Sequence, residues 1–334
     1  MRVVFAGSPP FATSLFAELL HSKHGVAALV TPHEKPKGRG LKVEASPLVD
    51  LSLNADVPVL YTSNANDPNF IQQIRELRPD VLVVASFGQL LKEELLTLAP
   101  NGALNVHASL LPKYRGASPV ARAILEGDAE TGVAIQRMVK KLDAGAVGAT
   151  LKITIREKET AGELTQRLAE AGATLLVNFL TELEAGRAVF VPQDETKATI
   201  CKKLTKEDGE IDWRRGAKTI ERFVRAMSPW PGAHSTIIAA SAGSAPPPAG
   251  VRVRILETEV KDNSSPPTEA GRILGLPQDP RGKAPQALDV TTSQGILTIL
   301  RIQPEGGKAL SAAEFLRGKR LVDGSRMQTA ASDL

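Results

Sequence analysis

The stretch Gly102–Arg115 reads GALNVHASLLPKYR, and its pattern is that of a buried strand followed by a polar turn. Alternate residues of a strand point to the same side, so Asn105 and His107 are expected to project together from its carboxyl end. Pro112 cannot extend a hydrogen-bonded ladder, so the strand is expected to stop before it. The segment Lys113–Gly116 then predicts a basic, flexible corner.

A carboxylate follows a second apolar run, in the tetrapeptide Leu142-Asp143-Ala144-Gly145. We expect Asp143 to lie at another strand end. An amide, an imidazole and a carboxylate can together stabilise negative charge on an oxygen and move protons, as acyl transfer requires. The alternative is that Asn105 and His107 form a satisfied structural pair. The density of polar and special residues after the strand favours catalysis.

Strands and helices alternate through the first half of the chain. Apolar, β-branched runs at 3–6, 26–30 and 81–85 have the length of buried strands. Later, apolar residues at three- and four-residue spacing predict a helix ending near Gly186, with a stripe made of Leu164, Leu168, Ala171, Leu175, Phe179 and Leu183. The alternation predicts a Rossmann-like α/β domain with a parallel sheet, whose ligands bind at the carboxyl ends of the strands.

The first turn of this domain does not suit a dinucleotide. In Gly7-Ser8-Pro9-Pro10, prolines stand where the Gly-x-Gly-x-x-Gly turn needs glycines for close backbone approach. The chain also has no Walker phosphate loop. We therefore expect neither a nicotinamide nor a nucleoside triphosphate as cofactor.

Composition is typical of a two-domain cytoplasmic protein. The chain has 334 residues, of which 42% are hydrophobic, and its single cysteine is Cys201. One cysteine permits neither an intramolecular disulfide nor a cysteine metal cluster, and no metal is expected. The apolar runs are too short for a signal peptide or a membrane span. A monomer is the default expectation.

Positive charge is concentrated in the carboxyl-terminal part. From Cys201 onward there are 20 basic and 15 acidic residues, an excess of five, whereas the preceding part has 21 and 22. Such an excess can attract the phosphates of a nucleic acid, although an ordinary solvated surface would also explain it.

The pattern changes after residue 189. The polar segment 190–206 predicts a linker between a first domain at 1–189 and a second at 207–325, with a tail at 326–334. Short β-type runs separated by turns predict a small antiparallel barrel, with strands at 235–238, 251–259, 287–292 and 295–302. Within it, the Ser/Ala/Pro-rich stretch 241–250 is expected to be a disordered insertion. Trp213 and Trp230 are expected to pack rather than to stack on bases.

Several motifs resemble the folate-dependent formyltransferases: FAGSPPFA (5–12), SFGQLL (86–91), GALNVHASLLPKYRGASPV (102–120) and GVAIQRM…LDAG (132–145). Two more, KLTKEDGEIDW (203–213) and SPWPGA (228–233), resemble the carboxyl-terminal domain of the members that act on tRNA. The resemblance covers nearly the whole chain. It implies that the carboxyl-terminal barrel is OB-like and binds tRNA.

The resemblance also implies a reaction, in which the formyl group of 10-formyltetrahydrofolate passes to the α-amino group of methionyl-initiator tRNA. The amine would attack directly, Asn105 and protonated His107 would stabilise the oxyanion, and Asp143 would orient the imidazole and handle the proton. Three alternatives stay open. They are formyl transfer to another amine such as a nucleotide sugar or glycinamide ribonucleotide, hydrolysis of formyltetrahydrofolate, and non-catalytic tRNA binding.

The resemblance further implies two sets of contacts. The folate would lie against two segments, made up of Ser109, Leu110, Leu111 and Pro112 and of the backbone of Phe87, Gly88, Gln89 and Leu90. Phe87 departs from the family, where a tyrosine is common. The basic segment Thr31–Lys42 would order against the acceptor end of the tRNA through Lys35, Lys37, Arg39 and Lys42, although a mobile solvated loop is the simpler alternative.

Overall fold

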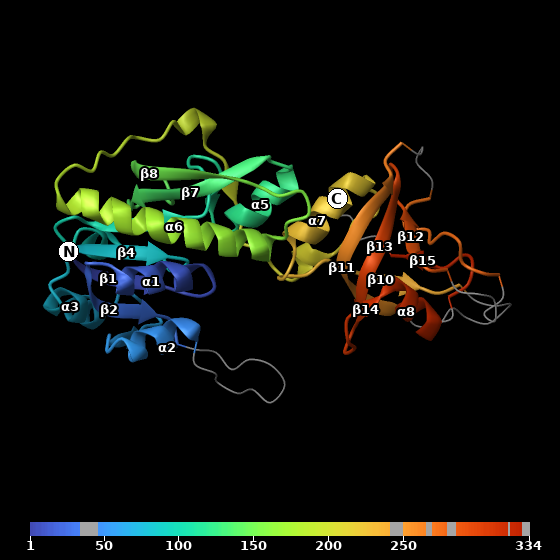
Figure 1. Ribbon diagram of the computed structural model, residues 1–334, viewed down its shortest axis with the longest axis horizontal. Coiled ribbons are helices and arrows are strands. Elements are labelled where there is room, and N and C mark those ends of the chain that lie inside the picture. Colours follow the sequence, from blue (N-terminus) through green and yellow to red (C-terminus); the bar gives the residue numbers. More distant parts are fainter. Residues whose placement is uncertain (34–45, 241–249, 265–268, 279–284, 320, 329–334) are drawn as a thin grey trace. The chain divides into compact units, whose positions relative to one another are not determined.

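The computed structural model describes residues 1–33, 46–240, 250–264, 269–278, 285–319 and 321–328 (Figure 1). The chain divides into two compact units, which are described separately. The first contains 1–123, 129–156 and 163–203, and the second contains 124–128, 157–162 and the residues from 204 onward. The domain bounds expected from the sequence stay a prediction.

The first unit is built on a seven-stranded sheet in the order β3-β2-β1-β4-β5-β7-β8. Its strands are β1 (Arg2–Gly7), β2 (Gly25–Thr31), β3 (Val59–Tyr61), β4 (Val81–Ala85), β5 (Ala103–His107), β7 (Glu130–Arg137) and β8 (Val147–Thr154). The strands from β3 to β5 are parallel, whereas β7 is antiparallel to both β5 and β8. The Rossmann-like prediction is confirmed, and the sheet is mixed rather than parallel throughout. The connection from β7 to β8 is too short for the crossover that parallel strands need.

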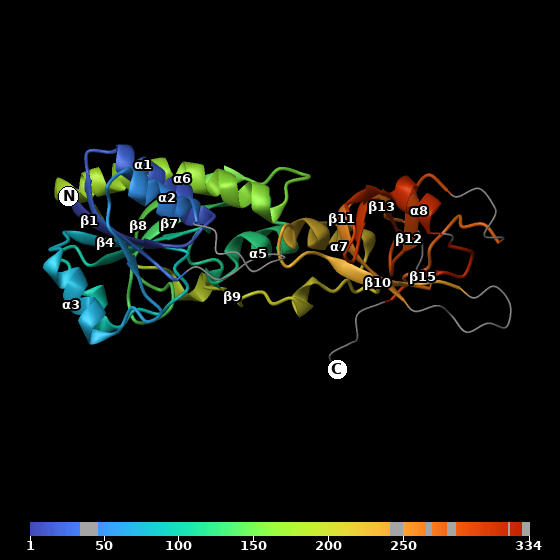
Figure 2. The same cartoon turned by 90° about the horizontal axis from the view of Figure 1, so that it is seen from below.

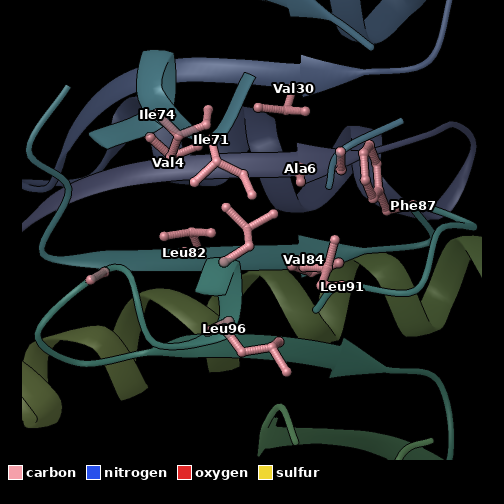
Figure 3. Close-up of a cluster of buried hydrophobic side chains, with 14 of the residues drawn as sticks. Val4, Ala6, Val30, Ile71, Ile74, Leu82, Val84, Phe87, Leu91 and Leu96 are labelled. Carbon is pink, nitrogen blue, oxygen red and sulfur yellow. The ribbon is translucent and has the colours of Figure 1, made fainter. Parts of the chain in front are cut away.

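Helices cover both faces of this sheet, with α1 and α6 on one face and α3 on the other (Figure 2). The helices in this part of the chain are α1 (Phe11–His21), α2 (Pro47–Asn54), α3 (Pro68–Glu76), α4 (Glu93–Leu96), α5 (Pro119–Glu126) and α6 (Ala161–Glu184). Alternate residues of β1 face opposite helices. Val4 and Ala6 join the cluster that packs on α3 and α4 (Figure 3), while Phe5 packs on Phe16 of α1, with ring centroids 5.2 Å apart.

The apolar stripe of α6 is offset from the predicted one. Its buried residues are Leu164, Leu168, Ala169, Gly172, Ala173, Leu176, Phe179 and Leu180. Ala171, Leu175 and Leu183, which were predicted to belong to the stripe, are only partly buried. Spacing alone could not distinguish neighbouring stripes, because this helix carries apolar residues around much of its circumference.

The second unit is a small antiparallel barrel, as predicted. Its sheet runs in the order β12-β13-β11-β10-β15, and β14 pairs with β13. The elements are α7 (Ala217–Ala226), β10 (His234–Ile238), β11 (Val251–Asp262), β12 (Leu288–Thr291), β13 (Ile296–Pro304), β14 (Leu310–Ser311), α8 (Ala312–Gly318) and β15 (Arg326–Met327). Bridges from Arg272 to Arg326 and from Ile273 to Val290 join the two edges of the sheet. Residues 272–273 therefore complete the ring of strands.

The two tryptophans of this unit differ. Trp213 is fully buried and its indole Nε1 donates to Ser235 Oγ over 3.1 Å, which confirms the prediction of packing. Trp230 is 52% exposed, so for this residue the same prediction is wrong. The predicted insertion at 241–250 falls, apart from Gly250, outside the described residues.

Candidate active site

The carboxyl end of β5 carries the two side chains that the sequence singled out. Asn105 and His107 lie on the same side of the strand, and β7 pairs beside them with Asn105 opposite Gln136 and His107 opposite Ala134. Directly opposed residues of antiparallel strands share a face of the sheet. Gln136, which is 1% exposed, therefore lies on the same face of the sheet as Asn105 and His107.

Asp143 lies in the turn between β7 and β8 rather than at a strand end. Its carboxylate accepts three hydrogen bonds: Asn105 Nδ2 and Gln136 Nε2 donate to Oδ1 over 3.2 and 2.9 Å, and Gly116 N donates to Oδ2 over 2.8 Å. The side chain is 11% exposed. The turn thus brings the carboxylate to the amide of Asn105.

The imidazole of His107 lies within reach of the same carboxylate. Its Nδ1 is 3.8 Å from Asp143 Oδ2, which is too long for a hydrogen bond but close enough for charge attraction. Its Nε2 lies 2.9 Å from the carbonyl oxygen of Tyr114, an acceptor only, so Nε2 carries the hydrogen. The backbone carbonyl of Tyr114 therefore orients the ring, and the Nδ1 edge faces Asp143.

The corner after β5 is buried and well connected, in contrast to the flexible corner predicted there. Tyr114 and Arg115 are 5% and 3% exposed. The short strand β6 (Arg115–Gly116) pairs with β9 (Ile200–Cys201), which belongs to the segment predicted as a linker. This pairing fixes the corner that supplies the Tyr114 carbonyl to His107 and the Gly116 amide to Asp143.

Left-handed backbone is concentrated at this site. Of the non-glycine residues with positive φ, Ser86, Tyr114 and Asp143 have values of 51°, 58° and 46° and lie after β4, after β5 and in the β7–β8 turn. Such conformations cost of order 1 kcal/mol each and persist where the surroundings impose them. Here they aim a carbonyl at His107 and a carboxylate at Asn105.

The residues expected to hold the folate are divided between surface and core. Leu110, Leu111 and Pro112 are partly buried, whereas Ser109 is fully buried and its Oγ donates to Lys113 O over 2.6 Å. In the other segment Gly88 and Leu90 are exposed.

Phe87 and Gln89, in the same second segment, have side chains that serve the fold. Phe87 points into the core cluster beside Ala6 (Figure 3). The side chain of Gln89 bonds to the backbone of Thr62 and Ala65. The departure from tyrosine at Phe87 therefore concerns the core.

The four cations expected to contact tRNA, Lys35, Lys37, Arg39 and Lys42, lie outside the described residues. Among the residues that the structure does describe, no group of three or more His, Cys, Asp or Glu side chains is arranged to hold a metal ion. Across the same residues, no helix is both long and apolar enough to cross a membrane.

Sequence reasoning missed three residues of the site: Gln136, Arg115 and Gln193. Gln136 could have been found only by knowing that β7 runs antiparallel to β5. Arg115 donates to Gln193 and to Glu195, and both partners lie about 80 residues away in the chain. No local spacing signals contacts of that range.

Two family models match the chain. Residues 1–180 match the formyl transferase model, and residues 203–320 match the model of the formyl transferase C-terminal domain. The methionyl-tRNA formyltransferase of Roseiflexus castenholzii is 38% identical over 328 residues, which cover 98% of this chain and 99% of that relative. The methionyl-tRNA formyltransferase of Moorella thermoacetica is 36% identical, with coverage of 97% and 98%.

Solved structures share the fold. HypX from Aquifex aeolicus, in complex with tetrahydrofolic acid, aligns with a TM-score of 0.61 at 18% identity, covering 94% of this chain and 46% of that one. The N-formyltransferase from Helicobacter canadensis aligns with a TM-score of 0.62 at 15% identity, covering 89% and 98%. Together with the matches along the whole sequence, these findings show that the chain belongs to the formyl transferase family, in the branch of the methionyl-tRNA formyltransferases.

Proposed function

We propose that this protein transfers the formyl group of 10-formyltetrahydrofolate to the α-amino group of methionyl-initiator tRNA. The observation that carries the proposal is the convergence of Asn105, His107 and Asp143 at the carboxyl end of β5. Similarity over the full length to methionyl-tRNA formyltransferases supports the choice of substrates.

Asn105 and His107 stabilise the charge that the reaction creates. As the amine nitrogen bonds to the formyl carbon, negative charge develops on the formyl oxygen. Asn105 Nδ2 has a second hydrogen beyond the one given to Asp143, and protonated His107 offers Nδ1–H, because Tyr114 already holds Nε2. One well-placed donor of this kind contributes roughly 3–4 kcal/mol to lowering the barrier.

Asp143 handles the proton. Its Oδ1 accepts two hydrogen bonds and its Oδ2 accepts one from the described residues, so Oδ2 has room for another donor. The bond between the formyl carbon and N10 then breaks, and Asp143 passes the proton lost by the amine, through a water, to N10. No covalent bond to the protein is needed.

The folate, when bound, supplies the formyl group, and the chain offers groups suited to it. Leu110 and Leu111 are partly buried apolar residues, and Gly88 and Leu90 are exposed residues whose backbone could reach the folate. A flat heterocycle needs such apolar walls and a few backbone hydrogen-bonding groups. Lys35, Lys37, Arg39 and Lys42 remain the proposed contacts to the acceptor end of the tRNA. We also propose that the enzyme is cytoplasmic and monomeric.

One assay separates this function from its competitors. Purified protein is incubated with 10-formyltetrahydrofolate and charged initiator tRNA, and both formylmethionine and tetrahydrofolate are measured. Formylmethionine formed in step with tetrahydrofolate is the expected result. Tetrahydrofolate without formylmethionine would identify a hydrolase, and transfer only to a nucleotide-sugar amine or glycinamide ribonucleotide would identify another substrate. Binding of tRNA with no turnover would leave a non-catalytic protein.

A further inference from the structure

The carboxamide of Gln193 makes an unusually complete set of hydrogen bonds near the proposed active site. Its Nε2 donates to the carbonyl oxygens of Asp143 and Gly145 over 2.8 and 2.7 Å. Its Oε1 accepts from Arg115 Nε and Nη2 over 3.0 and 2.8 Å. These four bonds use both amide hydrogens and both lone pairs, so the side chain has one well-defined orientation.

The turn that carries Asp143 needs such support. Asp143 has φ +46°, a left-handed conformation that a non-glycine residue holds only when its surroundings impose it. The two carbonyl groups bound by Gln193 are that of Asp143 itself and that of Gly145, two residues further along the turn. Holding both of them fixes the rotation of the backbone at Asp143 and hence the direction of its side chain.

The other end of the same side chain reaches the corner after β5. Arg115 is 3% exposed, and Glu195 Oε1 lies 2.7 Å from its Nη2, so its charge is balanced. The residue before Arg115 gives its carbonyl to His107, and the residue after it gives its amide to Asp143. Gln193 therefore connects the turn of Asp143 to the corner that holds His107.

Gln193 also lies close to the amide that binds the carboxylate directly. Its Nε2 is 3.3 Å from Gln136 Oε1, while Gln136 Nε2 donates to Asp143 Oδ1 over 2.9 Å. The backbone and the carboxylate of Asp143 are thus held through neighbouring amides. Both amides lie in the first unit, although Gln193 belongs to the segment that precedes the second.

We infer that Gln193 is a positioning residue for formyl transfer, which sets the relative placement of Asp143 and His107 without touching the reacting atoms. This inference rests on the proposed function. A misplacement of about 1 Å at catalytic groups can lower turnover by about 100-fold. Replacing Gln193 would misplace Asp143 and His107 without removing a contact to either substrate. It should therefore reduce kcat and leave KM for both substrates nearly unchanged.

The test compares Gln193→Ala and Gln193→Glu with the wild type and with Gln166→Ala, a control at an exposed position of α6. Gln193→Glu keeps the length and the acceptor for Arg115 but loses both donors to the turn, so it tests the donors if the alanine variant does not fold. We expect kcat to fall about 10- to 100-fold in both Gln193 variants, with KM within about twofold and the control unchanged.

A double-mutant cycle with Asp143→Asn, assayed with enzyme in excess over tRNA, identifies the residue through which Gln193 acts. If Gln193 works by placing Asp143, Gln193→Ala should cost little further turnover once the carboxylate is gone. Undiminished kcat in a folded variant, a change confined to KM, or a full additional loss in the Asp143→Asn background would each overturn the inference. A wild type that forms no formylmethionine would instead overturn the proposed function.

Discussion

The side chain of Asp143 is held by donors from three parts of the chain: Asn105 on β5, Gln136 on β7 and the backbone of Gly116. Asn105 and His107 could be predicted as a pair because alternation along a strand depends only on local geometry. Gln136 and Gln193 could not, because their contacts depend on strand direction and on pairing across the fold. The contact in which the Tyr114 carbonyl orients His107 could not be predicted from the sequence either.

A substitution at Gly145 tests whether the turn after β7 must pass close to the end of β7 at Arg137. A Cβ built at this position would overlap the carbonyl oxygen of Arg137, so the backbone would have to move. We expect Gly145→Ala to lower the free energy of unfolding by roughly 1–3 kcal/mol and to reduce turnover, because Asp143 lies two residues away. Urea unfolding and formylation assays would measure the two effects. Gly25→Ala is the control, since a Cβ there meets nothing within 4 Å, and equal behaviour of the two variants would contradict the account.

The carboxyl of Glu195 makes the stability of the folded protein depend on pH, in a direction that follows from its pKa. The pKa of its carboxyl is lowered from 4.5 to about 2, because Arg115 and then Lys141 donate hydrogen bonds to it. A lowered pKa in the folded protein means that the ion pair adds stability above about pH 4.5, and that this stability is lost as the pH falls toward about 2.

Glu195→Gln should therefore be less stable than the wild type near neutral pH, and the two should converge on acidification. Chemical unfolding at a series of pH values would measure this difference. Glu130→Gln, at an exposed carboxyl on β7, is the control. A difference between wild type and Glu195→Gln that does not change with pH would argue against the ion pair.

At the scale of elements, the positions of strands and helices followed from apolar periodicity, whereas strand direction did not. The runs at 81–85 and 102–107 correspond to β4 and β5, and the short runs of the second half correspond to β10–β13. The antiparallel direction of β7 and β8 decides which side chains face Asn105. Direction depends on how the connections fold back, and a periodicity within one segment carries no information on that.

The offset stripe of α6 gives a matched pair of variants. Leu176 is fully buried, while its neighbour Leu175 is only partly buried. We expect Leu176→Ala to lower the free energy of unfolding by about 2–5 kcal/mol, because it leaves a cavity under the helix, and Leu175→Ala to cost clearly less. Urea unfolding followed by circular dichroism would compare them. A larger loss at Leu175 would mean that the helix is rotated from the orientation described here.

At the scale of the whole molecule, the sequence predicted two kinds of architecture because their element lengths differ so strongly. Long helices alternating with buried strands mark the first half, and short strands with turn-rich connections mark the second. The ring closure through residues 272–273 was not foreseen, since these residues form isolated bridges rather than a strand of recognisable length. The contacts between the corner at Arg115 and the segment 190–206 were not predicted either, because they join residues about 80 positions apart in the chain.

The excess of five positive charges from Cys201 onward predicts a salt dependence for one substrate only. If about two tRNA phosphates are neutralised on binding, a fourfold rise in salt should raise KM for the charged tRNA roughly tenfold. The KM for the folate should change little over the same range. Initial rates with one substrate varied and the other saturating would measure both. Equal sensitivity of the two KM values would count against electrostatic tRNA binding.

The role of His107 is tested most directly by the rate of formyl transfer to methionyl-initiator tRNA, measured for the wild type and for His107→Ala with both substrates saturating. Removing the imidazole removes a donor to the developing oxyanion. We expect rapid transfer by the wild type and a kcat about 100- to 1000-fold lower in the variant. Transfer by His107→Ala at the wild-type rate would contradict it.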